Sequence, residues 1–514
     1  MKQSMPFLSC LTLLLFAACG AEEPEIPAGP PNIIYILADD LGYGELGSYG
    51  QELIETPNLD LLAERGMRFT QHYSGAPVCA PARAVLLMGK HTGHAHVRGN
   101  DEDGQRGDVW NFRAMFDDPR LEGQRPIPDS LVTLGEVLQE AGYVTGLVGK
   151  WGLGAPYSEG VPNRQGFDYF YGYNCQRQAH NLYPTHLWEN ESRVMLENEL
   201  LAPHVVREQA EGETDSAFFG RFLQEDYAPA FMQAAALEFV RANAEDPFFL
   251  YYASPLPHLP LQAPERWVNY YREKFGPEPS QYRNKGYFPC QYPRATYAAM
   301  ISYLDEQVGQ LVAELKELGE YENTLIMFSS DNGTTYTGGV DAEFFASGGP
   351  FPNGRGYGKG YVREGGVRVP MIAHWPGVIT AGTTTDHISG FQDILPTLAA
   401  VAGTEAPTGG DGISFLPTLK LQEQAEHPHL YWEFASYGGQ QAVRKGKWKA
   451  IRQEMQQGNL EVQLYDLSAD IREENDVSGE YPEILAEMEA ILEAEHRPSS
   501  FERFRFVALG EKDR

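Results

Sequence analysis

Two pairs of residues in the sequence offer the oxygen ligands that hard metal ions prefer. Asp39 stands next to Asp40, and Asp331 stands next to Asn332. Carboxylate and amide oxygens favour Ca²⁺ or Mg²⁺ over zinc. A cation held by them would neutralise an incoming anionic group and polarise a nucleophile. The simpler alternative is that these residues cap or turn the chain after a strand.

A cysteine supplies the second chemical feature, in the segment CAPAR that runs from Cys79 to Arg83. We expect this segment to begin a helix, because proline is tolerated in the first turn, and a helix N-terminus favours anions. A free cysteine is commonly a small core residue. A thiol is a poor match for a hard-oxygen metal site, which indicates that Cys79 does not act as a thiol.

The elements that must position these residues follow from the hydrophobic pattern. Strands are predicted at 32–38, 144–148, 248–253, 324–330 and 369–374, and helices over 131–141 and 301–318. Asp39, Lys150, His258 and Asp331 come after the first four strands. Ligands of an open α/β sheet bind outside the carboxyl ends of its strands. We therefore predict an α/β fold in which these side chains converge on one rim of the sheet.

The length and a change in pattern predict two domains. At 514 residues the chain can bury a large core. From about residue 405 short alternating strands are predicted at 430–434, 442–451 and 462–467, followed by an amphipathic helix near 484–492. We predict a catalytic domain over 32–404 and a smaller α+β domain over 405–514.

The composition limits the possible partners. A hydrophobic content of 42% and an aromatic content of 12% are typical of a globular protein. The formal net charge of −31 excludes a generic nucleic-acid binder, since no basic surface dominates. An anionic substrate must therefore find a local positive pocket against an unfavourable global field.

The N-terminus resembles a secretory signal of the lipoprotein type over residues 1–19. The apolar run at 7–16 is too short to span a bilayer. Ala17-Ala18-Cys19 is similar to a bacterial lipobox, although Phe16 stands where leucine is usual. Residues 20–31 form an acidic, proline-rich linker. We expect export to the periplasm, outer membrane or cell surface, with a lipid on Cys19 as the membrane attachment; an ordinary cleaved signal is the alternative.

Three cysteines follow the predicted signal: Cys79, Cys175 and Cys290. An odd number in an exported protein leaves at least one unpaired thiol. Cys175 and Cys290 could form a disulfide, which the sequence does not decide.

Several blocks, in order, resemble one known family. Besides CAPAR and the LLMGK after it, they are DD at 39–40, GKW at 149–151, PH at 257–258, DNG at 331–333, KGYVREGGVRVP at 359–370, DGISFLPTL at 411–419 and LYDLSADIREENDV at 464–477. They are similar to the blocks of formylglycine-dependent (type I, arylsulfatase-like) sulfatases of the alkaline phosphatase superfamily. Within that family, the chain resembles exported bacterial carbohydrate sulfatases. The resemblance covers nearly all of the mature chain. It implies a large mixed sheet sandwiched by helices, and hydrolysis of sulfate esters.

The resemblance implies two cofactors. One is a single Ca²⁺ ion, held by Asp39, Asp40, Asp331, Asn332 and the modified Cys79. The other is formylglycine (3-oxoalanine), made from Cys79 by a formylglycine-generating or an anaerobic sulfatase-maturing enzyme. Its hydrate carries two hydroxyls on one carbon. One hydroxyl would attack sulfur and displace the alcohol, and deprotonation of the other would then expel sulfate.

The resemblance also assigns roles to four basic residues. Arg83 and Lys150 would hold the hydrate and offset charge. Lys359 and His258 would bind sulfate and protonate the leaving oxygen. The alternative for the lysines and the arginine is an ordinary solvated surface charge, and for His258 a loop position.

One block departs from the family pattern. Where the family has GKWHLG, this chain has GKWGLG, so Gly152 replaces the histidine that serves as the base in sulfate release. Either another group substitutes or turnover is impaired. We favour His180 as the substitute, and His94 and His96 are the other candidates. Each could instead be an ordinary core or loop histidine.

The predicted substrate is a sulfated carbohydrate. Aromatic side chains between 167 and 188 could stack on sugar rings, although such clusters are more often core. The polar residues that could read sugar hydroxyls are His94, Arg98, Asn100, Arg177 and Asn181. The resemblance suggests galactose or N-acetylgalactosamine 4-sulfate. The alternatives are a formylglycine phosphodiesterase or phosphonate monoester hydrolase, and an inactive protein that binds sulfated glycans, which Gly152 makes plausible.

Overall fold

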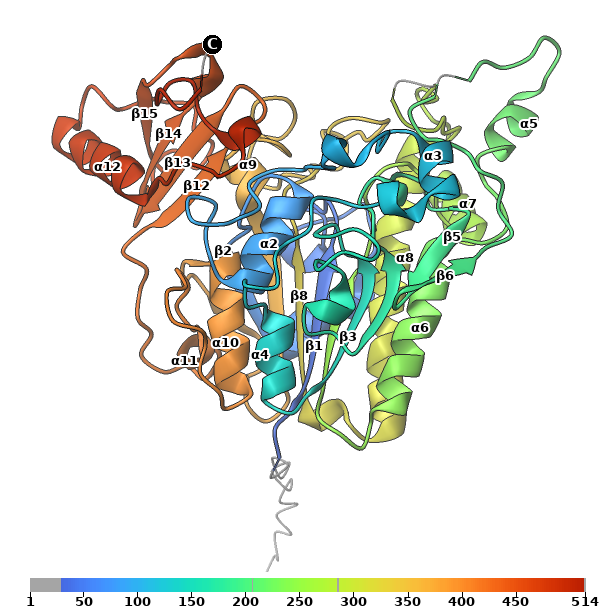
Figure 1. The fold of residues 1–514 in the computed structure, drawn as a ribbon, viewed down its shortest axis with the longest axis horizontal. Helices are drawn as coiled ribbons and strands as arrows, with labels where there is room; N and C mark the ends of the chain where they lie inside the picture. Colours follow the sequence, from blue (N-terminus) through green and yellow to red (C-terminus); the bar gives the residue numbers. More distant parts are fainter. Residues whose placement is uncertain (1–28, 206, 284–285, 513–514) are drawn as a thin grey trace, which may run out of the picture.

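The computed structural model describes residues 29–205, 207–283 and 286–512. These residues form a large domain around a mixed sheet and a smaller domain that lies to one side of it (Figure 1). The predicted signal at 1–19 and positions 20–28 of the predicted linker lie outside the described residues. Within the described ranges, no helix is both long and apolar enough to cross a membrane.

The large sheet has 11 strands in the described part of the chain, in the order β10-β2-β9-β8-β1-β7-β3-β4-β5-β6, with β11 paired to β2. The strands are β1 (Asn32–Ala38), β2 (Met67–Tyr73), β3 (Val144–Lys150), β4 (Tyr169–Tyr173), β5 (His186–Glu189), β6 (Ser192–Met195), β7 (Phe248–Ala253), β8 (Thr324–Ser330), β9 (Arg368–His374), β10 (Thr383–Thr385) and β11 (Ser389–Gly390). Strands β8, β1, β7 and β3 are parallel neighbours, so their carboxyl ends finish at one rim. Strand β9 is antiparallel to β2 and β8, which confirms the predicted mixed sheet.

Alternating side chains of β1 explain why helices cover both faces of this sheet. Ile34 and Ile36 pack in one core, and Ile33 and Leu37 pack in the other, because successive strand residues point to opposite faces. The first core is covered by α1 (Pro57–Arg65), α6 (Ala228–Ala242), α7 (Glu265–Phe275) and α8 (Pro293–Leu318), and the second by α2 (Cys79–Met88), α4 (Leu134–Glu140), α10 (Ile394–Val401) and α11 (Leu416–Leu419) (Figure 1). Helices α3 (Phe112–Asp117) and α5 (Asp215–Gly220) lie outside these two layers.

Most predicted elements of the large domain occur at the expected positions. Strands β1, β7 and β8 have the predicted bounds, while β3 is longer and ends at Lys150. The helix expected over 131–141 begins only at Leu134, because Thr133 and Glu136 form a capping box there. The helix expected over 301–318 extends back to Pro293, a residue suited to the first turn.

The smaller domain is an antiparallel sheet of β12 (Leu430–Phe434), β13 (Gln440–Lys445), β14 (Trp448–Arg452) and β15 (Val462–Asp466), with α12 (Pro482–Glu495) on one face. The prediction of a single strand at 442–451 is wrong. Gly446, with φ of +54°, turns the chain between β13 and β14, a conformation that glycine adopts without Cβ strain. Phe415 and Leu419, which fall in the predicted range 405–514, pack in the core of the large domain.

A buried ionic group joins the two domains beside the segment that carries Lys359. Lys449 of β14 lies 2.8 Å from Glu364 Oε1 and 3.1 Å from Glu473 Oε1, and all three side chains are buried. Glu364 begins the short helix α9 (Glu364–Val367) and also accepts a hydrogen bond from Tyr73 of β2. The smaller domain thereby fixes the chain directly after Lys359.

The sequence left open whether Cys175 pairs with Cys290, and in this structure both thiols are free. Cys175 packs with Phe112 and Met115 in one cluster, whereas Cys290 belongs to the main core and lies 3.4 Å from Thr296 Oγ1. Separate burial explains why neither needs a partner.

We predict that Lys449→Met destabilises the protein by about 3 kcal/mol or more, because it leaves two glutamates buried without their shared cation. Urea denaturation measures the change in the free energy of unfolding. Lys447→Met is the matched control, since Lys447 has a side chain that is 51% exposed and pairs with Asp466. Equal effects of the two substitutions would contradict the structural role of Lys449.

Candidate active site

The predicted site residues meet at the rim where the parallel strands end. Asp39 and Asp40 follow β1, Lys150 ends β3, His258 follows β7, and Asp331 and Asn332 follow β8. The four strands are adjacent in the order β8-β1-β7-β3, so residues far apart in the sequence become neighbours. This is the arrangement that ligand sites of open α/β sheets use.

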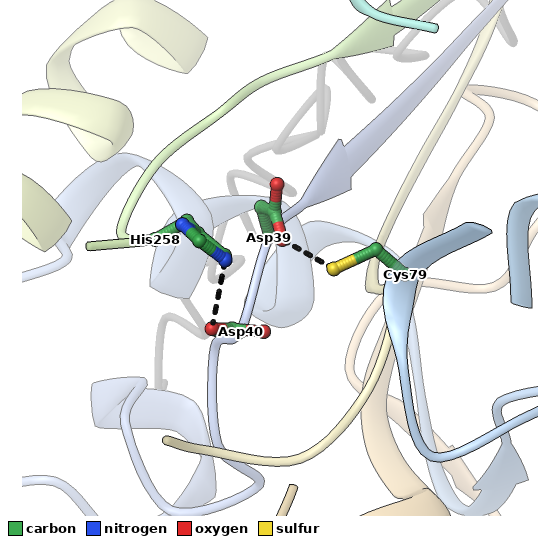
Figure 2. A group of neighbouring side chains, drawn as sticks. All are labelled: Asp39, Asp40, Cys79 and His258. Carbon is green, nitrogen blue, oxygen red and sulfur yellow. Dashed lines mark hydrogen bonds and ion pairs between the residues drawn. The ribbon is translucent and has the colours of Figure 1, made fainter. Parts of the chain in front are cut away.

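Cys79 lies against this rim as the first residue of α2. Its Sγ is 3.3 Å from Asp39 Oδ1 and 3.7 Å from Lys359 Nζ. Figure 2 shows Cys79 and His258 approaching the Asp39–Asp40 pair from opposite sides. Burial, followed by the charges of Asp331 and Asp39, raises the pKa of the Cys79 thiol well above its usual value. The unmodified thiol is therefore protonated at neutral pH and a weak nucleophile.

Three permanent cations balance the three carboxylates of the site. The closest pairs are Lys150 Nζ to Asp39 Oδ2 at 2.5 Å, Lys359 Nζ to Asp40 Oδ1 at 2.5 Å, and Arg83 Nη2 to Asp331 Oδ2 at 2.9 Å. Burial alone raises the pKa of Asp39, but Lys150, His258 and Arg83 outweigh it and hold that pKa well below its usual value. When all three carboxylates are ionised, the charges of these six side chains cancel.

His258 presents a defined nitrogen to the site. Its Nδ1 lies 2.7 Å from the carbonyl oxygen of Leu259, which can only accept, so Nδ1 carries the proton. Nε2 then faces Asp40 Oδ2 at 3.6 Å. Burial and the charge of Lys359 lower the pKa of His258 to about 4, which keeps the imidazole neutral at pH 7.

The oxygen donors fit a hard divalent cation. Asn332 donates from Nδ2 to Asp40 Oδ1 at 2.8 Å, while its Oδ1 is buried without a hydrogen-bond partner. Burial and the charge of Asp39 raise the pKa of Asp331 to about 7. A cation among these atoms would use the free oxygen of Asn332 and offset the repulsion between the carboxylates. Donor atoms of Asp39, Asp40, Cys79 and His258 all lie within 4.8 Å of one another.

The structure places His180 against His258. The two rings stack with centroids 4.9 Å apart at 14°. His180 Nδ1 also lies 3.0 Å from His204 Nε2, and the ring of Tyr287 packs against both histidines. His204 and Tyr287 were not predicted from the sequence, because each stands alone in an irregular segment without a motif around it.

The position that lost the family histidine is crowded by another side chain. Gly152 has φ of +80°, and a Cβ built on it would lie 3.0 Å from Gln176 Oε1. A larger residue at 152 therefore requires Gln176 to move. His96, one of the alternative bases, lines a small cavity together with Gly152 and Ala80. His94, the other alternative, pairs instead with Asp411.

Most residues predicted to read sugar hydroxyls make internal contacts. Arg98 is buried and forms an ion pair with Glu433. The remaining contacts are Asn100 Oδ1 with the Ala80 amide at 3.2 Å, Arg177 with Glu102 at 3.0 Å, and Asn181 Nδ2 with the Leu201 carbonyl at 3.3 Å. Their contacts with a sugar stay predictions.

The aromatic side chains predicted as a sugar platform belong mainly to the core. Phe167, Phe170, Tyr171, Tyr173, Tyr183 and Trp188 are all buried. The exposed ring nearby is Trp110, which is 59% exposed, lies under the guanidinium of Arg177, and lines a surface pocket together with His180 and His204. No sequence signal marks Trp110, since it follows a loop of glycines and acidic residues.

The mixed sheet between two helical layers, with acids, cations and Cys79 on one rim, defines a hydrolase of the alkaline-phosphatase-like fold. The chain belongs to the sulfatase family: the family described as Sulfatase matches residues 31–404. A second family, described as N-sulphoglucosamine sulphohydrolase, C-terminal, matches residues 354–497. The protein is therefore a sulfuric ester hydrolase.

Named relatives agree with this assignment. Arylsulfatase A of Bos taurus is 34% identical over 466 residues, 87% of this chain and 78% of the relative. N-acetylgalactosamine-6-sulfatase of Homo sapiens is 31% identical over 449 residues, 84% of this chain and 74% of the relative. The crystal structure of Ps i-CgsB, also determined in complex with k-i-k-neocarrahexaose, is 28% identical with a TM-score of 0.70 and matches 94% of this chain and 96% of that chain.

We predict that Arg83→Met destabilises the protein by about 3–5 kcal/mol in the absence of metal, because Asp39 and Asp331 lose a buried cation. Arg113→Met is the matched control: Arg113 and Asp117 form a pair whose side chains are 69% and 56% exposed, so we expect a change below about 0.5 kcal/mol. Chemical denaturation compares the two. A small effect at both positions would contradict the charge balance described for the site.

Proposed function

We propose that this sulfatase acts on a sulfated carbohydrate of the galactose or N-acetylgalactosamine type, with Ca²⁺ and a formylglycine at position 79. The observation that carries the proposal is the buried rim itself, where four oxygen donors, three cations and Cys79 meet. The sugar is supported by relatives named for N-acetylgalactosamine 6-sulfate and by a structural neighbour bound to a carrageenan oligosaccharide.

Asp39, Asp40, Asp331 and Asn332 would hold the ion. When bound, Ca²⁺ would supply positive charge to the sulfate oxygens, and a hydrated formylglycine at position 79 would supply the hydroxyl that attacks sulfur. With all three carboxylates ionised, as a bound cation favours, the six charged side chains carry no net charge, so a divalent cation gives this rim a net positive charge. That charge meets the requirement for a local positive pocket in a chain of net charge −31.

The side chains around position 79 have separable tasks. Lys359 lies between Asp40 and Cys79, where it can bind a sulfate oxygen and orient the group for attack. His258 keeps its Nδ1 proton on Leu259, so Nε2 is the nitrogen that faces the site. It would take up the proton of the attacking hydroxyl and pass it to the leaving ester oxygen. Arg83 and Lys150 hold Asp331 and Asp39 in place.

His180 is the proposed base for sulfate release, in place of the histidine absent at Gly152. Its ring stacks on His258, so it lies beside the site. Burial and the nearby His258 lower its pKa well below the usual value, so the imidazole is neutral at pH 7 but a weaker base than a free histidine.

We predict that Cys79→Ala abolishes sulfate release from sulfated galactose and N-acetylgalactosamine saccharides, while Cys290→Ala, which changes a buried cysteine outside the site, keeps it. The assay uses protein matured in cells, with peptide mass spectrometry at position 79 and ion chromatography of released sulfate. Matched phosphate esters are the comparison substrates. An active protein carrying an unmodified thiol at 79, or faster turnover of the phosphate esters, would refute the proposal.

The same assay decides the ester position. Our sequence-based expectation is a 4-sulfate, whereas the relatives are named for a 6-sulfate. Turnover of the 6-isomer alone would overturn the 4-sulfate expectation and leave the sulfatase assignment intact.

We predict that His180→Ala lowers kcat by about 100-fold or more and leaves Ca²⁺ affinity unchanged, because a base acts on turnover and not on the ion. His96→Ala is the comparison variant, since His96 lies beside Gly152. Steady-state kinetics and calcium titration calorimetry measure both. A loss confined to His96→Ala would transfer the role to His96, and an unaffected rate in His180→Ala would remove His180 from the mechanism.

A further inference from the structure

A second group of metal-ligating side chains lies beyond the opposite end of α2 from Cys79. His91, His94 and Asp411 each offer a ligand atom within 4.8 Å of the other two. Helix α2 has 10 residues and separates the two groups by about 15 Å. The group therefore has no part in the active site at the N-terminus of α2.

Two residues of the smaller domain complete this group. Glu495, the last residue of α12, lies with Oε2 3.2 Å from His91 Nε2 and 3.7 Å from His94 Nε2. Its other oxygen, Oε1, is 3.0 Å from Nε2 of His429, the residue directly before β12. Three imidazoles and two carboxylates from four separate segments thus meet at the domain junction.

The backbone at Gly93 lies unusually close to the end of α12 at this junction. A Cβ on Gly93 would lie 2.5 Å from the carbonyl oxygen of Glu495, so only glycine lets the two segments come so near. Asp411 is held in turn by the backbone amide of His91, which donates to its Oδ2 at 3.0 Å. Positioned carboxylates of this kind are typical of metal sites.

The spacing of the ligand atoms suits a coordinated transition metal. Metal–ligand distances of about 2.0–2.1 Å in a tetrahedral site place neighbouring ligand atoms about 3.3 Å apart. Here His94 Nδ1 is 2.9 Å from Asp411 Oδ1, and His91 Nε2 is 3.2 Å from Glu495 and 3.7 Å from Asp411 Oδ2. His91 Nε2, Glu495 Oε2 and Asp411 Oδ2 are therefore spaced as neighbouring donors of such a site, and His94 lies beside them.

The types of ligand atom indicate which ion would bind, and a cavity gives that ion a route to them. Imidazole nitrogens with carboxylates favour Zn²⁺ over Ca²⁺, in contrast to the oxygen donors of the active site. His94 lines a cavity of about 570 Å³, which gives an ion a route from solvent.

We propose that His91, His94, Asp411 and Glu495 form a Zn²⁺ site that connects the smaller domain to the segment after α2. His429 contacts Glu495 and helps to position it. The site is independent of the sulfatase reaction, and its ligands come from both domains.

The test is zinc titration calorimetry on the intact protein in buffer saturated with Ca²⁺, with metal content checked by mass spectrometry. We expect one Zn²⁺ per chain, and affinity at least about tenfold weaker in His94→Ala and in His429→Ala. His387→Ala removes a half-buried histidine outside the group and should bind as the wild type does. Asp40→Ala, which alters the active site, should also keep the zinc.

Thermal denaturation supplies a second readout that does not depend on how stable each variant is. Zinc should raise the Tm of the wild type and of His387→Ala above their own metal-free values, and should not raise that of His94→Ala. Unchanged zinc affinity in both histidine variants would overturn the proposal. Loss of zinc in Asp40→Ala with retention in His94→Ala would also overturn it, by assigning the ion to the active site.

Discussion

Three carboxylates buried at the rim of one sheet are the constraint on which the rest of the site depends. Asp39, Asp40 and Asp331 are almost inaccessible to water, and like charges in such a place are stable only when cations compensate them. Arg83, Lys150 and Lys359 do so from α2, β3 and the segment before α9. The carboxylates thus fix where each cation must lie, and the cations surround position 79.

The smaller domain contributes to this balance from a distance. Lys359 lies outside the strands and helices. The chain after it is fixed at Glu364, which forms a buried ion pair with Lys449 of β14. The face of the small sheet that carries Trp432 packs on Tyr73 and Val367 of the large domain. The proposed zinc site would add a third connection between the domains, at the far end of the helix that begins with Cys79.

The loss of the family histidine at Gly152 is accompanied by a different arrangement of polar groups nearby. Gln176 occupies the space beside Gly152, and the histidine that contacts the site is His180, which packs between His258 and His204. Stacking on His258 places a neutral imidazole beside the site from another element. This arrangement is the physical reason to expect an active enzyme where the motif alone suggests impaired turnover.

The sequence by itself determined the parallel strands of the large sheet and the residues that end them, because apolar runs and the polar residues after them are local signals. It also indicated that Cys79 begins a helix. Tertiary structure alone decided that Arg98 turns to Glu433, that the aromatic residues of 167–188 form core, and that His204, Trp110 and the histidines around Asp411 gather as they do. Those outcomes are contacts between side chains that lie far apart in the sequence. Such contacts depend on how the segments pack together and cannot be inferred from the pattern of any one segment.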